Sequence, residues 1–138
     1  MTMLTPVLAL IVWTLIVWIW MYATRIPAMQ KAKIDPQDAI HPGSLSTLPS
    51  EARVVADNYN HLHEQPTLFY ALAIYSFLVG VGDPLNVWLA WGYVAARVAH
   101  SLAQIVIKKV PLRFFIFAAG SVILMIIAAR NVIALLAV

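Results

Sequence analysis

Side chains that could bind a ligand or move a proton gather in one short stretch of the chain, residues 56–72, which reads ADNYNHLHEQPTLFYAL. This stretch carries two carboxylates and two histidines, namely Asp57, His61, His63 and Glu64. Carboxylate and imidazole groups take part in acid–base chemistry, ligand binding and metal coordination. His61 and His63 point about 200° apart on a helix, so they cannot hold one metal ion together. The stretch therefore indicates a polar ligand site rather than a metal site.

Two polar stripes emerge when these groups are placed on helices. Arg53, Asp57, His61 and Glu64 follow the spacing i, i+4, i+8, i+11 of one helix face. A second stripe consists of Arg97, His100, Ser101, Gln104 and Lys108. Since the two helices meet the same face of a membrane, Glu64 and Arg97 fall at comparable depth, and we expect them to pair.

The stripes need a polar surrounding. Ionisable groups inside a membrane cost about 2.5–3.5 kcal/mol each on insertion scales, so the stripes must face protein or water. We interpret them as the lining of a polar cleft that binds a ligand. The alternatives are a buried Glu64–Arg97 pair that only joins two helices, and histidines that are satisfied polar residues near the interface.

A proline lies close to the carboxylate of the first stripe. Pro66 has no amide hydrogen, so it deprives the carbonyl of Leu62 of its helical hydrogen bond. We expect a kink beside Glu64 that opens the helix pair, with a tolerated membrane proline of no further role as the alternative.

The composition places these polar groups in a membrane protein. Of the 138 residues, 62% are hydrophobic and 11% charged, against about 45–50% apolar and about 25% charged in soluble domains. The net charge of only +3, without an RNA- or DNA-binding motif, predicts no nucleic-acid partner and favours anionic lipid headgroups. The chain has no cysteine and no HExxH motif, so we expect no metal, and any reacting thiol must arrive as a substrate.

Four windows are long and apolar enough to cross a membrane, at residues of about 4–24, 52–81, 84–108 and 112–137. The last two connections are short, which implies antiparallel neighbours. We therefore predict an all-α membrane protein, a four-transmembrane-helix antiparallel bundle that fills one domain, residues 1–138. The first window carries no charge and no basic region before it, so we interpret it as a retained helix.

The basic residues predict the orientation of the bundle. They lie in the first connection and around the third, at Arg25, Lys31, Lys33, Lys108, Lys109 and Arg113. The second connection offers only Asp83. By the positive-inside rule, loops 1 and 3 are cytoplasmic and both termini lie outside. Arg130 then falls near the opposite interface, where we interpret it as an arginine whose head group reaches the water.

Four short motifs resemble, in order, those of a known family, the membrane-associated proteins in eicosanoid and glutathione metabolism (MAPEG). DPQDA at 35–39 resembles the Asn-Pro-Glu-Asp-Ala of the family's first cytoplasmic loop. HLHEQPTLFYAL at 61–72 resembles its Asn-x-x-Glu segment followed by proline and aromatics, in the form typical of bacterial members. ARVAH at 96–100 resembles the Gly-Arg-Val-Ala-His of its prostaglandin E synthases, and PLR at 111–113 resembles its Pro-x-Arg.

The resemblance implies a homotrimer of four-helix bundles, with active sites in the clefts between neighbouring subunits near the cytoplasmic side. It implies glutathione as the thiol co-substrate, which family enzymes conjugate to lipophilic electrophiles or use to isomerise or reduce them. We therefore predict a glutathione transferase or peroxidase whose partners are membrane lipids and a lipophilic small molecule. A bacterial-type member implies a multi-pass protein of the bacterial inner membrane.

Carried over by position, the resemblance assigns roles to single residues. Glu64 corresponds to the residue that takes the glutathione amino group, and His61 replaces the motif asparagine. Arg97 and His100 correspond to residues that contact the ligand or hold the cleft. Gln104 stands in place of a ligand-contacting tyrosine.

Arg113 is the expected catalytic residue, because it corresponds to an arginine near the thiol. A guanidinium there favours the thiolate by lowering the thiol pKa from about 8.5, which makes a nucleophile available at neutral pH. Asn60 and Arg53 complete the expected substrate-binding set. Asn60 stands where the eicosanoid enzymes carry an arginine, and Arg53 and Arg25 are candidates to replace that charge.

Departures from the eicosanoid enzymes keep a second interpretation open. Asp57 also replaces an arginine, Phe114 replaces a serine beside the thiol, and Pro27 falls where a first-helix arginine would be. The alternative is a non-catalytic lipid-binding or scaffold protein of the same fold. A channel or transporter is more distant, since one four-helix protomer offers no repeated broken helices.

Overall fold

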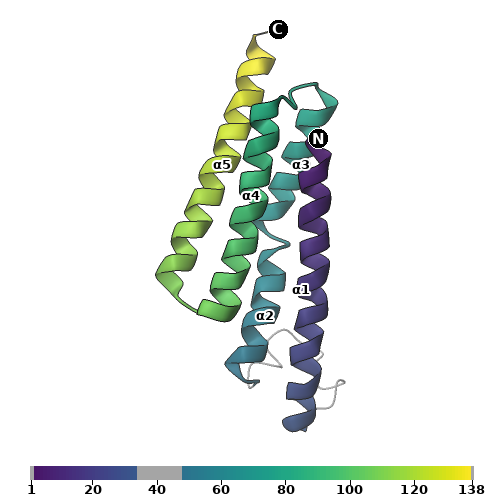
Figure 1. Cartoon of the computed structure of the whole chain (residues 1–138), viewed down its shortest axis with the longest axis vertical. Coiled ribbons are helices and arrows are strands. Elements are labelled where there is room, and N and C mark those ends of the chain that lie inside the picture. The colour runs from purple at the N-terminus through teal and green to yellow at the C-terminus, as the bar shows by residue number, and fades with distance from the viewer. Residues whose placement is uncertain (1, 34–47, 138) are drawn as a thin grey trace.

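The protein folds as an elongated bundle of helices (Figure 1). The computed structural model describes residues 2–33 and 48–137, so the DPQDA motif at 35–39 lies outside the described residues. Within these two ranges the chain is helical and has no strand. The elements are α1 (Leu4–Lys31), α2 (Ser50–His61), α3 (Gln65–Leu78), α4 (Pro84–Leu102), the π-helix η2 (Ala103–Ile107) and α5 (Val110–Leu136).

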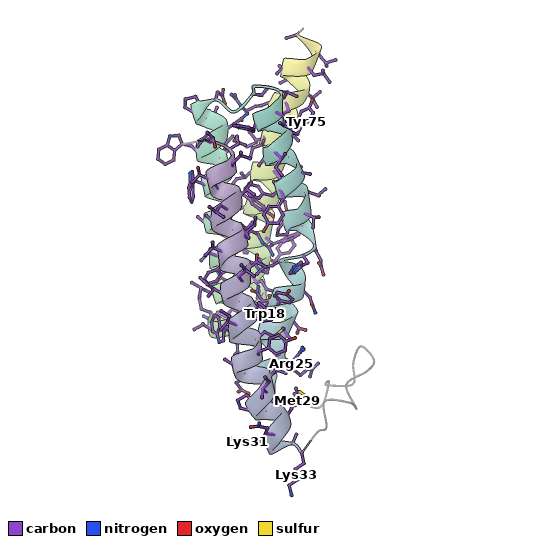
Figure 2. The ribbon with its side chains drawn as sticks, turned by 90° about the vertical axis from the view of Figure 1, so that its right-hand side faces the viewer. Trp18, Arg25, Met29, Lys31, Lys33 and Tyr75 are labelled. Carbon is purple, nitrogen blue, oxygen red and sulfur yellow. The ribbon has the colours of Figure 1, made fainter. Side chains whose placement is uncertain are left out.

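The helices run lengthwise and antiparallel. α1 runs from the N-terminal end to the opposite end, α2 and α3 return one after the other, and α4 and α5 form a second hairpin (Figure 1). α4 packs chiefly on α5, and α1 packs chiefly on α2. Figure 2 shows Lys31 and Lys33 at the lower end of α1 and Tyr75 of α3 towards the upper end. The chain therefore has a basic lower end, and both termini lie towards the upper end.

The membrane-crossing capacity is unequal among the helices. In the described part of the chain, α1 and α5 are each long and apolar enough to cross a membrane. The predicted window at 52–81 is instead split into two helices of 12 and 14 residues, α2 and α3. A helix of 14 residues reaches only about 21 Å at 1.5 Å per residue. A crossing along this path therefore requires α2 and α3 in series.

Aromatic and apolar side chains fill the interior, where Phe69 and Tyr93 are fully buried. Their rings stack with centroids 4.7 Å apart. The Tyr93 hydroxyl donates a hydrogen bond to Oε1 of Gln65 at 3.1 Å, and Nε2 of Gln65 donates to Oγ of Ser121 at 2.7 Å. These bonds join α3, α4 and α5 directly after the point where α2 ends.

An ion pair closes the upper end of the bundle. Arg130 of α5 pairs with Asp83, and its Nε donates to Oδ1 of the buried Asn86 at 2.7 Å. Asp83 also accepts a hydrogen bond from the amide of Asn86 at 3.0 Å and so caps the start of α4. The Arg130 side chain is 33% exposed at this end, and the structure adds to the expected contact with water a carboxylate that the second turn brings within its reach.

Candidate functional site

A break between α2 and α3 shapes the first part of the site. α2 ends at His61, and α3 begins at Gln65 with Pro66 in its first turn. The predicted kink is thus a complete interruption, in which the amides of residues 62–64 bond within short turns. Pro66 suits the first turn of a new helix, where its missing hydrogen has no partner to lose. Glu64 precedes α3, and its side chain is 66% exposed.

Glu64 contacts His61 rather than Arg97. Nδ1 of His61 lies 3.4 Å from Oε2 of Glu64. Arg97 is only 2% exposed, and its Nη2 donates to the backbone carbonyl of His61 at 3.4 Å. The prediction of a direct Glu64–Arg97 pair is therefore wrong for the single chain. The break turns Glu64 towards the surface, and the carbonyl of His61 at the end of α2 accepts from both the Glu64 amide, at 3.1 Å, and Arg97.

His100 completes a cluster that we call the helix-break group: His61, Glu64, Arg97 and His100. The His100 ring meets the His61 ring edge-on, with centroids 5.9 Å apart. Nδ1 of His100 and Nε of Arg97 are buried without a hydrogen-bond partner among the described residues. A buried polar atom without a partner costs about 1–3 kcal/mol. The group is therefore suited to a polar ligand that supplies the missing bonds.

A π-helix positions Gln104. α4 passes after Leu102 into η2, a wider kind of turn that is frequent at functional sites. Gln104 is 4% exposed, and its Oε1 accepts a hydrogen bond from Nδ2 of the buried Asn58 at 3.0 Å. Lys108 follows the π-helix as its C-terminal cap, and its φ of 63° lies in the left-handed region. No pattern in the sequence predicts this π-helix, and Asn58 stands out there only as one polar residue among several.

Arg113 lies in a pocket at the junction of η2 and α5, which we call the basic pocket. Its volume is about 210 Å³. Its polar lining consists of Ser50, Gln104, Lys108, Lys109 and Arg113. Among the described residues that line it, three are basic and none is acidic. The structure thus brings Gln104 and Arg113 together in a setting that attracts anions.

Other candidate residues lie outside the basic pocket. Arg53 and Asn60 are exposed on α2, and neither lines it. Glu64 does not line it either, so one chain presents the helix-break group and the basic pocket as two separate parts. Over residues 2–33 and 48–137, no group of three or more histidine, cysteine or acidic side chains could hold a metal ion.

Comparison with known proteins identifies one family. The model of the MAPEG family matches residues 3–133, which is nearly the whole chain. These residues include the helix break, the π-helix and the basic pocket. No curated protein and no solved structure matches the chain.

Proposed function

The chain belongs to the MAPEG family, and on this premise we propose that it is a membrane-embedded glutathione transferase or peroxidase acting on lipophilic electrophiles. The family consists of membrane-associated helical proteins of eicosanoid and glutathione metabolism, which generally form trimers and use glutathione. The observation that carries the proposal is the basic pocket, which holds Arg113 beside Gln104 in a chain of this family. A chain without cysteine also requires its reacting thiol to come from a substrate.

The helix-break group fits the polar parts of glutathione. The exposed carboxylate of Glu64, next to His61, suits an ammonium group. Nε of Arg97 and Nδ1 of His100, which lack partners among the described residues, suit carboxylate or amide oxygens. In this proposal Asn60 and Arg53 add an amide and a guanidinium from the exposed side of α2.

Arg113 is the residue to which we assign the activation of the thiol. Glutathione supplies a thiol, and such groups ordinarily have a pKa of about 8.5. The Arg113 guanidinium, beside the sulfur, stabilises the anion and so lowers the pKa of the thiol. Arg113 thereby keeps a nucleophile available at neutral pH for attack on the lipophilic substrate.

Glutathione binding by the detergent-solubilised protein tests this proposal. Calorimetry and thermal unfolding should both detect binding at millimolar glutathione, since a ligand at 100 times its Kd raises the free energy of unfolding by about 2.7 kcal/mol. Glu64→Gln should weaken that binding. Glu51→Gln makes the same change on an exposed carboxylate in the first turn of α2 and should not. Stabilisation by lipid alone, with none by glutathione, contradicts the proposal.

A non-catalytic lipid-binding or scaffold protein is the second candidate. The observation that favours it is Phe114, which is 63% exposed and places an apolar side chain directly after Arg113. An exposed aromatic side chain such as that of Phe114 suits contact with an acyl chain better than contact with a polar thiol substrate. The lipid-only outcome of the binding experiment would support this candidate.

Assembly and orientation complete the proposal. We propose a homotrimer in the bacterial inner membrane, built from one four-span domain of residues 1–138, with loops 1 and 3 cytoplasmic and both termini outside. Lys31, Lys33 and the basic pocket at one end of the bundle support this orientation. The separation of Glu64 from the basic pocket within one chain supports a site that a neighbouring subunit completes.

A further inference from the structure

The basic pocket holds more positive charge than one thiolate requires. Lys108 and Lys109 line it together with Arg113, without an acidic residue among the described lining. Three cations around a volume of about 210 Å³ repel one another, and an anion bound among them relieves that repulsion. The charge of the pocket therefore selects an anionic group.

Gln104 adds a directional donor for such an anion. Its side chain lines the pocket although only 4% of it is exposed. Its Oε1 is occupied by Asn58, while its Nε2 donates to none of the described residues. The pocket also lies at the start of α5, where Pro111 has no amide hydrogen and the Arg113 amide donates to the Lys109 carbonyl at 3.1 Å, so the donors of the pocket are side chains. An amide donor and three cations together suit a phosphate oxygen.

Apolar side chains continue from the pocket along α5. Val110 lines the pocket and is 63% exposed, and Phe114 follows one turn later with the same exposure. The pocket and this strip together match a ligand that has an anionic head and an apolar tail. A membrane protein is surrounded by lipids, and anionic lipids have such a head and tail.

We propose that the basic pocket binds the phosphate group of an anionic phospholipid, held by Lys108, Lys109 and Gln104, with an acyl chain along Val110 and Phe114. Basic pockets between membrane helices on the cytoplasmic side bind such headgroups. Free inorganic phosphate shares the head chemistry but has no tail to place on the strip. The inference goes beyond the proposed function, since it concerns a lipid held in the absence of any thiol.

Native mass spectrometry tests the lipid site on the full chain. The protein is reconstituted in nanodiscs with equal amounts of phosphatidylglycerol and phosphatidylcholine. The lipid that stays bound to the protein after the protein is released from the nanodisc is identified. The wild type should retain phosphatidylglycerol in preference, and no preference would overturn the proposal. The double variant Lys108→Gln/Lys109→Gln should bind phosphatidylglycerol about thirty-fold more weakly, from roughly 1 kcal/mol per lysine. Thermal unfolding establishes that each variant is folded.

A matched control separates the pocket from general surface charge. Lys31→Gln/Lys33→Gln removes the same charge from the end of α1, where neither lysine lines the basic pocket. Because exposed charges outside the pocket are screened by salt, this variant should weaken binding less than about threefold. An equal loss in both double variants would overturn the proposal.

Inorganic phosphate distinguishes the two sources of the anion. If it raises the unfolding temperature as much as phosphatidylglycerol does, the site serves a soluble phosphate and the lipid proposal is overturned. A rise with the lipid alone supports the lipid. These readouts contain no glutathione and no turnover, so their failure is distinct from a failure of the proposed function.

Discussion

Three arginines of this chain have three different surroundings, and the surroundings predict three roles. Arg97 is buried and caps the end of α2 through a backbone carbonyl. Arg130 is bound to Asp83 and Asn86 at the upper end of the bundle. Arg113 lines an open pocket in which no acidic residue of the described chain meets it. Of the three guanidinium groups, that of Arg113 is the one available to a ligand sulfur.

Arg113→Ala should shift the pH dependence of turnover to alkaline pH. If Arg113 lowers the pKa of the bound thiol, the wild-type thiolate persists below the ordinary thiol pKa and disappears as the pH falls through the lowered value. Without the guanidinium the thiolate forms only near about pH 8.5, and turnover at neutral pH falls about ten-fold or more. The pH–rate profile and the ultraviolet thiolate absorbance of bound glutathione measure the shift.

Arg113→Lys is the matched variant for this experiment. It keeps a positive charge near the sulfur, so it should retain part of the neutral-pH activity that alanine loses. Unchanged profiles in both variants, with glutathione still bound, would remove Arg113 from the chemistry.

Arg130→Ala should lower the free energy of unfolding by about 1–3 kcal/mol, because Oδ1 of the buried Asn86 loses its donor. The ion pair itself contributes little, since the Arg130 and Asp83 side chains are 33% and 46% exposed. Chemical unfolding in detergent measures the difference. Arg53→Ala, at an exposed position, should stay within about 0.5 kcal/mol. If Arg130→Ala also lowers the free energy of unfolding by less than about 0.5 kcal/mol, the prediction is wrong, and water has replaced the arginine as the donor to Asn86.

At the scale of the elements, two irregular places in the helices position the candidate residues. The break between α2 and α3 presents Glu64 and gives Arg97 a carbonyl to cap. The π-helix η2 places Gln104 in hydrogen-bond contact with Asn58 of α2, and Ala103 and Gln104 of η2 line the basic pocket. The bond between Asn58 and Gln104 therefore ties α2 to the pocket wall.

Asn58→Ala should weaken both the fold and the pocket. Oε1 of Gln104 loses its donor in a buried place, which costs about 1–3 kcal/mol of unfolding free energy. Asn60→Ala changes the same residue type on the exposed side of α2 and should cost less than about 0.5 kcal/mol. Thermal or chemical unfolding of the two variants measures the contrast. Equal losses would mean that the bond does not hold α2 to η2.

Part of this arrangement could be predicted from local sequence. The apolar windows predicted the helical class, which the structure confirms, and Pro66 marked the place where the second window is interrupted. The rest depends on contacts that local patterns do not contain. Arg97 bonds to the backbone carbonyl of His61, which also accepts a hydrogen bond from the Glu64 amide where α2 ends, and no local pattern places that carbonyl beside α4. The Arg130–Asp83 pair likewise joins α5 to the cap of α4 across 47 positions of the sequence, and no local pattern marks the π-helix.

At the scale of the whole molecule, the basic lower end predicts the orientation in the membrane. Reporter fusions after residue 40 and after residue 82 should report opposite sides, because the first lies in the connection rich in lysine and arginine and the second in a connection without them. The fusion after residue 40 should report the cytoplasm. The same side for both fusions would contradict four crossings, and reversed sides would contradict the orientation.

Complementation between subunits tests the proposed trimer and its shared site together. One chain keeps Glu64 and the basic pocket as separate parts, so we expect a complete site to take Glu64 from one subunit and Arg113 from its neighbour. At neutral pH and limiting glutathione, Glu64→Gln and Arg113→Ala should each retain about a tenth of the wild-type turnover or less as homotrimers. When both are co-expressed equally, random mixing in a cyclic trimer leaves about a quarter of the clefts with both native residues. Turnover should therefore return to about a quarter of the wild-type value, whereas a site built within one chain would recover nothing.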